Sequence, residues 1–379
     1  MKYRVLHLIG SNLVGGPEKQ ILHHAEAMKG SEYDIEIGSY HDLTEWPEVL
    51  SAASQRGIGT VCLKGGLHAG LINELTEILK ERPGCILCTH GFKSNVVGYL
   101  AAKRTRTPHI AFLRGFTAEN SRVAFYEVLE RQALKRAPWV VCVSQKQAEQ
   151  IGKLRGSRPQ PVVVPNVMLP PFSREHDGPA VSRQSLGFPE DAFVFGSVGR
   201  LSIEKGHRFL ISAFHELTTM VGNDVPLRLI VIGDGAEQER LEQQAAQLGI
   251  RDKVHFAGFQ GNCGEWMRLF DCMVQPSLTE GTPNSVLEAI CLQVPVVATA
   301  VGGVPDLISD GRSGLLVPAS DPQSLAAAMK KMVDSPELRA RLVTGGWDVR
   351  DRHSPARQKQ KLVEVYERAL DRKRVAEYQ

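Results

Sequence analysis

The feature that most constrains the fold is a regular alternation of short apolar segments with longer amphipathic segments along the chain. In the first half, the segments with strand character are residues 3–9, 35–39, 60–63, 85–90, 108–114, 139–144 and 162–166. In the second half they are residues 193–198, 227–232, 254–256, 272–274 and 294–299. Segments with helical periodicity separate most of these strands. This order predicts parallel sheets covered by helices, with ligands at the carboxyl ends of the strands.

The length of the chain indicates more than one domain. A chain of 379 residues is too long for one typical hydrophobic core, so two α/β domains are expected. Residues 168–187 are rich in proline and charge and have little periodicity, which is typical of a linker. We therefore expect a first domain at residues 1–168, a second at 169–355 and a C-terminal helix within 356–379. The apolar face of that helix carries Leu362, Val365, Tyr366, Ala369 and Leu370.

Composition excludes several classes of protein. Apolar residues make up 42% of the chain and charged residues 23%, as in ordinary globular proteins. No apolar run approaches the ~20 residues that span a bilayer, and the apolar stretch at the start is too short for a signal peptide. Seven cysteines, an odd number in a long chain, favour a reducing compartment over a disulfide framework. These features predict a cytoplasmic protein.

Positive charge is concentrated in one block of the first half. Residues 80–158 contain fifteen lysines and arginines against five acidic residues, although the whole chain has a formal charge of only +3. This block suits an anionic acceptor or an anionic membrane surface. A solvated positive face without a partner explains it equally well. A nucleic-acid partner is not expected, because no recognition motif or pattern of stacking aromatic residues accompanies the charge.

The most informative stretch is residues 276–289, where a buried strand leads through a glycine turn into a helix. Thr282 is the expected N-cap and Pro283 the first helical residue, so backbone N–H groups and the helix dipole favour an anion such as a diphosphate. Glu280 precedes the helix and Glu288 lies inside it. Since carboxylates repel phosphate, we expect both to accept hydrogen bonds from hydroxyls. A nucleotide sugar has this pattern, whereas the simpler alternative is an ordinary connection with two solvated glutamates.

A second stretch, residues 196–206, supports an anion site. Its strand ends in a glycine turn that presents Arg200 and Lys205 just before a helix begins. Two cations and free N–H groups thus converge on one point, which suits a phosphate.

The first half contributes three further candidates. Gly15 and Gly16 lie in a glycine loop after the first strand, but this loop is not the G-x-G-x-x-G of dinucleotide-binding proteins. His90 follows a buried strand and is a candidate for acceptor binding or proton handling, or else a structural histidine. Arg114 ends another strand; an arginine cannot act as a base, so it would bind an anion or an oxygen atom.

These motifs resemble those of a known enzyme family. The run S-L-T-E-G-T-P-N-S-V-L-E-A with its E-x7-E spacing, and the run G-R-L-S-I-E-K-G at residues 199–206, resemble the donor-site motifs of retaining GT-B glycosyltransferases of family 4. The runs at 233–235, 257–259, 301–306 and 314–317 also match. The chain departs from the pattern at Arg114-Gly115, where many relatives have a histidine.

The resemblance implies an α/β fold of the GT-B type, with two Rossmann-like domains facing across a cleft. The donor would lie on the second domain and the acceptor on the first, and the C-terminal helix would cross back to the first domain. Glu280 would accept hydrogen bonds from the sugar and Glu288 from the ribose. The implied catalytic residues are Glu280, Arg200, Lys205, His90 and Arg114. The implied donor-binding residues are Gly15, Gly16, Arg200, Lys205, Gly233, Gly235, Phe259, Glu280, Gly281, Thr282, Pro283, Asn284, Ser285 and Glu288.

These features lead to one functional hypothesis with alternatives. The chain is expected to be a retaining glycosyltransferase that moves a sugar from a UDP- or GDP-sugar to a glycan, lipid-linked or small-molecule acceptor. The expected pathway is surface polysaccharide or glycoconjugate synthesis, and the expected location is the cytoplasm, peripheral to the inner face of the membrane. No metal or other cofactor is expected, since the chain has no Asp-x-Asp. A GT-B nucleotide-sugar 2-epimerase and a non-catalytic nucleotide-sugar-binding partner are alternatives; an oxidoreductase fits poorly, because the dinucleotide loop is missing.

Overall fold

The protein divides into two compact units. The computed structural model describes residues 2–11, 14–40, 46–64, 68–114, 121–167, 181–222 and 225–371. The N-terminal unit comprises Met1–Val167 and Ser354–Gln379, and the C-terminal unit comprises Met168–His353. These boundaries differ by one or two residues from the expected ones. Gly115 and residues 168–180 of the expected linker lie outside the described residues.

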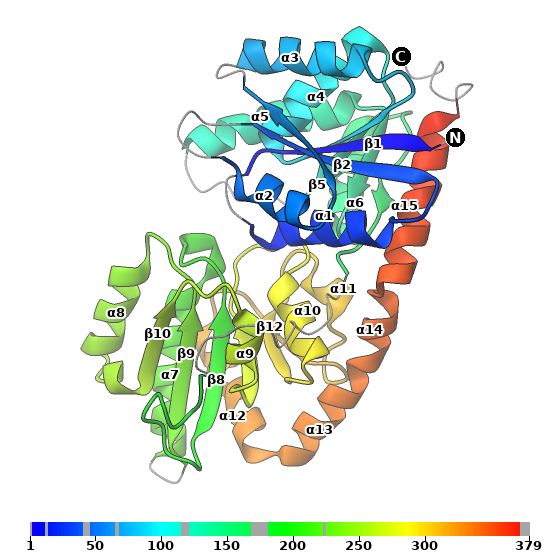
Figure 1. Cartoon of the computed structure of the whole chain (residues 1–379). Coiled ribbons are helices and arrows are strands. Elements are labelled where there is room, and N and C mark those ends of the chain that lie inside the picture. The colour runs from blue at the N-terminus through cyan, green and yellow to red at the C-terminus, as the bar shows by residue number, and fades with distance from the viewer. Residues whose placement is uncertain are drawn as a thin grey trace. The chain divides into compact units, whose positions relative to one another are not determined.

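The N-terminal unit is built on a seven-stranded sheet in the order β3-β2-β1-β4-β5-β6-β7 (Figure 1). All of its neighbouring strands pair in parallel. The strands are β1 (Tyr3–Ile9), β2 (Tyr33–Tyr40), β3 (Gly59–Leu63), β4 (Ile86–His90), β5 (His109–Leu113), β6 (Trp139–Cys142) and β7 (Val162–Val163).

Helices cover both faces of this sheet. Helices α1, α2 and α15 pack on one face, and α3, α4, α5 and α6 pack on the other. They are α1 (Gly16–Ala27), α2 (Glu48–Gln55), α3 (His68–Lys80), α4 (Phe92–Thr105), α5 (Ser121–Arg136), α6 (Gln145–Arg155) and α15 (Pro355–Leu370). Helix α15, red in Figure 1, buries Leu362, Val365, Tyr366 and Ala369, as its apolar face predicts.

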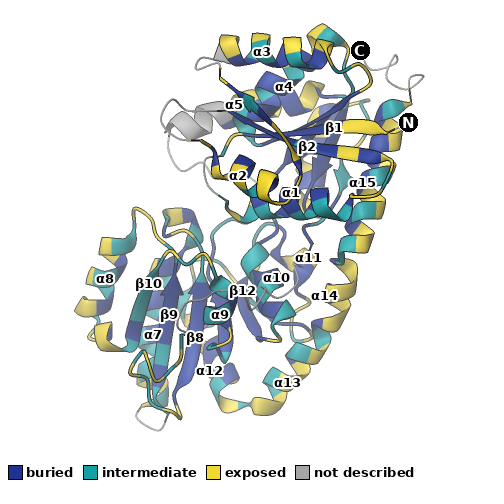
Figure 2. Cartoon of the chain, viewed as in Figure 1, coloured by how far each residue is buried: buried dark blue, intermediate teal, exposed yellow. Residues whose placement is uncertain are grey.

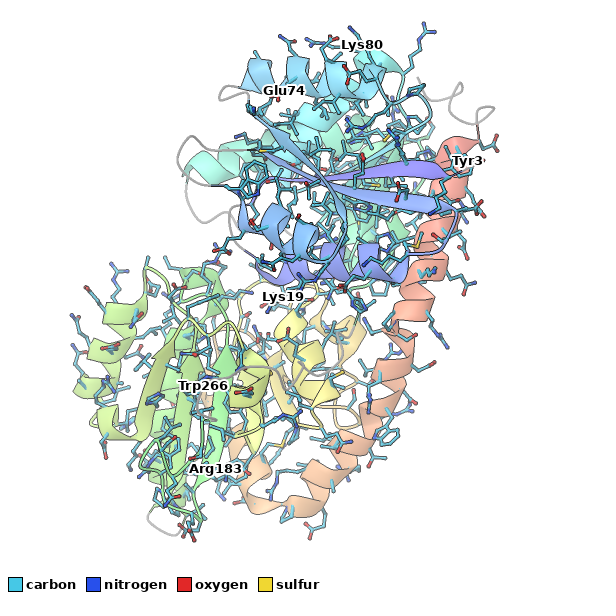
Figure 3. The ribbon with its side chains drawn as sticks, in the orientation of Figure 1. Tyr3, Lys19, Glu74, Lys80, Arg183 and Trp266 are labelled. Carbon is cyan, nitrogen blue, oxygen red and sulfur yellow. The ribbon has the colours of Figure 1, made fainter. Side chains whose placement is uncertain are left out.

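The C-terminal unit is built on a six-stranded sheet in the order β10-β9-β8-β11-β12-β13. Its neighbouring strands also pair in parallel. The strands are β8 (Phe193–Val198), β9 (Leu227–Ile232), β10 (Val254–Gly258), β11 (Cys272–Gln275), β12 (Val296–Thr299) and β13 (Leu315–Val317). Arg183, labelled in Figure 3, ties the start of this unit to its sheet by donating to Asp271 Oδ2 at 2.9 Å.

Helices again cover both faces. Helices α7, α8, α12 and α13 pack on one face, and α9, α10, α11 and α14 pack on the other. The helices are α7 (His207–Val221), α8 (Gln238–Gln247), α9 (Cys263–Met267), α10 (Asn284–Cys291), α11 (Val304–Leu307), α12 (Pro322–Asp334), α13 (Pro336–Gly345) and α14 (Trp347–Arg352). Two short 3-10 helices, Ile203–Lys205 and Arg251–Lys253, complete the unit.

The strands are apolar on both sides because helices cover both sides. In β8, Phe193 and Phe195 point into one core and Val194 points into the other, as the two-residue period of a strand requires. Figure 2 shows the strands of both sheets as mostly buried, apart from the exposed start of β1, and the outer faces of α3 and α8 as exposed. The strands were therefore recognisable in the sequence, whereas α6 was not predicted, because its run QKQAEQIGKLR has little apolar character.

Each sheet has one place where the strand order reverses. In the N-terminal unit it lies between β1 and β4, and in the C-terminal unit between β8 and β11. The chain leaves neighbouring strands in opposite directions at such a point, so the loops after the two strands separate and leave room for a ligand. The loops after β8 and β11 are the two stretches that the sequence singled out.

Candidate functional site

Two loops interlock at the carboxyl edge of the C-terminal sheet. After β8, Leu201 N donates to Asp234 O at 2.7 Å, and Glu237 N donates to Leu201 O at 2.9 Å. Gly233 has a φ of +132°, and a Cβ there would lie 2.0 Å from Gly199 O. The loop after β8 and the loop after β9 can thus approach each other only because residue 233 has no side chain.

The loop after β11 is fixed against the loop after β8. Leu278 N donates to Glu204 O at 2.8 Å. A Cβ on Gly206 would lie 2.2 Å from Pro276 O. This close contact holds the start of α7 beside the turn that carries Glu280.

A third loop, which follows β12, supports the same turn from another side. Gly303 N donates to Gly281 O at 2.9 Å. Gly302 has a φ of +55°, and a Cβ there would lie 1.7 Å from Glu280 O. Gly302 lies in the matching run 301–306 but was not among the predicted site residues, yet the backbone of Glu280 could not lie here beside any other residue type.

The glutamate of this turn accepts three hydrogen bonds on one oxygen. Glu280 Oε1 lies 2.7 Å from Lys205 Nζ, 2.9 Å from Gln275 Nε2 and 2.7 Å from Ser277 Oγ. The Glu280 side chain is 6% exposed, and that of Lys205 is 24% exposed. The structure therefore brings two predicted site residues into direct contact and fixes the carboxylate in one orientation.

Gln275 and Ser277 were not identified from the sequence. Gln275 is the last residue of β11, and its Oε1 accepts a hydrogen bond from Ser285 Oγ at 3.0 Å. Its amide thus links the start of α10 to Glu280. The available signal was a glutamine at the end of the buried apolar run Cys-Met-Val-Gln, since a buried polar side chain requires partners.

Helix α10 begins one residue later than expected. Its N-cap is Pro283, with φ −68° and ψ 115°, and its first helical residue is Asn284. The prediction of Thr282 as N-cap was therefore wrong: the extended backbone of Pro283 precedes the first helical turn. Thr282 is buried just before the cap. The anion-binding end of the helix is consequently formed around Asn284 and Ser285.

The remaining predicted donor residues fall in two places. Arg200 is exposed at the end of β8, Gly235 is exposed in the next loop, Phe259 is 68% exposed after β10, and Glu288 is half-buried within α10. Gly15 and Gly16 belong to the N-terminal unit at the start of α1, where Gly15 N donates to Glu18 Oε2 at 3.0 Å. The structure thus groups the C-terminal candidates around one sheet edge.

His90 and Arg114 lie together at the carboxyl edge of the N-terminal sheet. Arg114 Nη2 lies 3.3 Å from His90 Nδ1, and Arg114 Nη1 donates to Asn166 Oδ1 at 3.0 Å. The other nitrogen of His90 lies 2.9 Å from His7 Nδ1. His90 is only 2% exposed, so it does not present an open ring nitrogen to a ligand, as a cleft-facing acid or base would.

Burial determines the charge states of this pair. Burial, the nearby Arg114 charge and the neighbouring histidines lower the pKa of His90 well below its usual value. Burial also lowers the pKa of Arg114 to about 10, against an opposing effect of Glu18. Arg114 therefore remains charged at neutral pH and His90 remains neutral, so Arg114 is the group of this pair that can bind an anion.

Comparison with known proteins identifies the family. The family of glycosyl transferases group 1 matches residues 180–347, and the glycosyl transferase 4-like domain matches residues 15–167. A D-inositol 3-phosphate glycosyltransferase of Thermomonospora curvata is 32% identical over 412 residues, covering 96% of this chain and 92% of the relative. The chain belongs to the glycosyl transferase group 1 family. This glycosyltransferase also shares 32% identity over 207 residues, 55% of its chain and 57% of the relative, with the lipopolysaccharide core biosynthesis glycosyltransferase LpsD of Rhizobium meliloti.

Solved structures agree on the fold of this glycosyltransferase. The structure of HepE from Anabaena in complex with UDP-glucose superposes with a TM-score of 0.82 at 22% identity, covering 96% of this chain and 99% of HepE. The glycosyltransferase therefore has the GT-B fold with two Rossmann-like units, as the sequence motifs predicted. Within the described residues, no helix has the length and apolar character needed to cross a membrane.

The support that Gly302 gives to Glu280 can be tested with a matched pair of variants. Gly302 and Gly249 both have positive φ values, but a Cβ on Gly249 would meet nothing within 4 Å. Gly249→Ala should cost about 1 kcal/mol of unfolding free energy from backbone strain alone. Gly302→Ala should cost about 1–3 kcal/mol more, because the backbone of Glu280 must move. Urea unfolding would measure both, and equal losses would contradict the proposed close packing.

Proposed function

We propose that this glycosyltransferase transfers a sugar from a nucleotide-sugar donor with retention of anomeric configuration. The observation that carries the proposal is the contact of Glu280 with Lys205 at the strand-order reversal of the C-terminal sheet. It places a hydroxyl acceptor and a phosphate-binding cation side by side, as the sugar and diphosphate of such a donor require. The UDP-glucose bound to the similar fold of HepE supports a UDP-sugar as the first candidate.

The donor would lie along the loops at this sheet edge. Arg200, Lys205 and the start of α10 would hold the diphosphate, because two cations and a helix N-terminus favour negative charge. Glu280 would accept hydrogen bonds from the sugar, and Glu288 from the ribose. The loop after β10, which carries Phe259, would contact the base. A thermal-shift panel of UDP- and GDP-sugars would identify the nucleotide, since a bound ligand stabilises the folded protein.

The proposed reaction is a front-face substitution. The bond from the sugar C1 to the leaving phosphate oxygen breaks, and a bond from C1 to the acceptor oxygen forms on the same face. The acceptor hydroxyl gives its proton to the leaving phosphate, whose charge Arg200 and Lys205 stabilise. Glu280 is poorly suited to be a covalent nucleophile, because its Oε1 already accepts hydrogen bonds from Lys205, Gln275 and Ser277.

The acceptor would bind the N-terminal unit through Arg114. A charged guanidinium with neutral partners at the carboxyl edge of a parallel sheet suits a phosphate or another oxygen-rich group. The relatives named for D-inositol 3-phosphate and for lipopolysaccharide core synthesis support an acceptor that carries negative charge, either a small molecule or a lipid-linked glycan. Such acceptors belong to surface polysaccharide or glycoconjugate synthesis.

The role of Glu280 predicts a ranking of variants and a stereochemical outcome. Glu280→Gln keeps the shape and one acceptor oxygen, whereas Glu280→Ala removes both oxygens, so Ala should lower kcat more than Gln. Glu239→Ala, on the exposed face of α8, is the control and should leave kcat unchanged. NMR coupling constants of the product should show the anomeric configuration of the donor. An inverted product, or a sugar covalently bound to Glu280, would refute the mechanism.

We also propose that catalysis requires no divalent metal, because Arg200, Lys205 and the start of α10 already stabilise the leaving diphosphate. EDTA should then leave the rate of UDP release essentially unchanged. Lys205→Ala should lower kcat on the order of 10²-fold, as expected when one charge-stabilising donor is removed. A large loss in EDTA that Mg²⁺ or Mn²⁺ restores would show that a metal performs this function.

The basic block supports a peripheral membrane location. Lys103 and Arg104 are exposed near the end of α4, and the exposed Leu100 lies one turn earlier on the same face. Helix α5 packs against α4 and exposes Val128 and Leu129. Apolar side chains between cations are typical of a surface that lies on anionic lipid. We propose that α4 and α5 form such a surface.

Charge reversal tests this surface. Replacing Lys103, Arg104 and Arg106 by Glu should abolish sedimentation with vesicles of phosphatidylcholine and phosphatidylglycerol, because each cation contributes about 1 kcal/mol near an anionic membrane. The affinity for UDP should not change. A matched control replaces the exposed Lys331, Arg341 and Arg350 of the C-terminal unit by Glu. If both triple variants sediment with the vesicles to the same extent, the basic block is an ordinary solvated surface and not a membrane-binding one.

A further inference from the structure

Arg114 is one end of a chain of buried hydrogen bonds that reaches the C-terminal helix. His90 Nε2 lies 2.9 Å from His7 Nδ1, and His7 Nε2 lies 2.9 Å from the Tyr366 hydroxyl. The same hydroxyl lies 2.8 Å from His24 Nε2. His7, His24, His90 and Tyr366 are all at most 3% exposed. The chain thus crosses from the sheet to α1 and α15 without contact with solvent.

The guanidinium gives this chain a single direction. An arginine only donates hydrogen bonds, so His90 Nδ1 must accept from it, and the proton of His90 must be on Nε2. His90 then donates to His7 Nδ1, and His7 donates from Nε2 to Tyr366. The Tyr366 oxygen accepts this bond, and its own proton is available to either of its other partners, His24 Nε2 at 2.8 Å and the Cys88 side chain. One charged group at the sheet edge therefore sets the tautomers of two histidines, His90 and His7.

The surroundings keep the histidines neutral. Burial, His24 and the Arg114 charge lower the pKa of His7 well below its usual value, and burial and the Arg114 charge are the main causes that lower the pKa of His24 to about 3. The titratable groups that face the chain from the packed elements are Glu18, His23, Tyr33, Cys88 and Lys359. Glu18 is the one carboxylate among them that acts on Arg114.

The second partner of Arg114 comes from the place where the chain leaves the N-terminal unit. Asn166 immediately precedes Val167, whose N–H and carbonyl both bond to the Gln20 side chain, at 2.8 and 2.9 Å. Gln358, near the start of α15, donates to Pro165 O at 3.1 Å. Arg114 is therefore held by Asn166, just before the chain leaves the N-terminal unit after residue 167. Through the hydrogen-bond chain to Tyr366, it is also linked to α15, which begins directly after the chain returns to this unit at residue 354.

We propose that Tyr366, His7 and His90 are positioning residues that fix the guanidinium of Arg114 for the transfer reaction. The functional part of this inference rests on the proposed role of Arg114 in acceptor binding. Arg114 is half-buried, and withdrawal of a guanidinium from water costs stability, which favours a functional reason for its retention. Among the described residues, Arg114 Nε has no partner, so the orientation of the group depends on Asn166 and on His90.

The same atoms line a small cavity. Its volume is about 10 Å³, and its lining includes Gln20, His24, His90, Arg114 and Gln358. This is about the space of one water molecule, so a modest shift of the guanidinium is sterically possible. Loss of the directional chain should allow this shift, because nothing else bonds to Nη2 of Arg114 among the described contacts.

The first experiment measures tautomers in the unaltered protein. Nitrogen NMR of the enzyme labelled with nitrogen-15 in its histidines should show His7 and His90 protonated on Nε2. In Tyr366→Phe the signals of His90, two hydrogen bonds away, should change together with those of His7. Tyr33→Phe is the matched control, since Tyr33 is also buried and its ring lies 5.2 Å from that of Tyr366. A wild-type His90 protonated on Nδ1, or an unchanged His90 in Tyr366→Phe, would overturn the proposal.

The second experiment measures turnover, as UDP released from UDP-glucose. Tyr366→Phe should lower kcat about tenfold or more with an unchanged KM for UDP-glucose, because a misplaced group affects the reacting geometry and not donor binding. Tyr33→Phe should match the wild type. Altered tautomers with unaltered turnover would overturn the positioning role. Full turnover in Arg114→Met would instead refute the proposed function of Arg114. The histidine tautomers of the wild type would still test the hydrogen-bond chain independently of that function.

Discussion

The contact between Lys205 and Glu280 is the interaction on which the candidate site depends. The two residues follow different strands, β8 and β11, which pair side by side although 75 positions separate the two side chains. The strand order reverses at this pair, so both loops end at the same edge of the sheet. A carboxylate among three donors is fixed before any ligand binds, and fixed groups lose little entropy when a ligand arrives.

Four loops, which follow β8, β9, β11 and β12, pack around this contact because glycines allow their backbones to touch. Gly206 lies against Pro276, Gly233 against Gly199, and Gly302 against Glu280. Each approach would be blocked by a Cβ, and each joins the turn of one strand to that of its neighbour. The rigidity of the site thus comes from backbone packing, while Gln275 and Ser277 set the orientation of the carboxylate.

In the N-terminal unit, the main constraint is a positive charge that is partly withdrawn from water. The unit encloses this charge, Arg114, among neutral histidines, an asparagine and a tyrosine, and this arrangement costs stability unless every partner is correctly oriented. An arginine cannot change its role as a donor, so the direction of the whole hydrogen-bond chain follows from it. The polar layer also connects the sheet edge to α15, which otherwise packs through apolar side chains.

The sequence by itself indicated the two α/β units, all of their strands except β13 and the motifs of the candidate site, because each of these leaves a local signal. Doubly covered strands are continuous apolar runs, and Glu280, Lys205 and Arg200 lie in short motifs whose spacing reflects a single turn. The start of α10 was misjudged by one residue, since proline suits both the cap and the first turn. What only the tertiary structure decided are contacts between distant positions: Gln275 and Ser277 on Glu280, Gly302 under the same turn, and Tyr366 with His7 across 359 positions. Some of these residues lie in local patterns, as Ser277 and Gly302 do in the family motifs. The patterns do not reveal their partners, because folding alone brings residues so far apart in the sequence together.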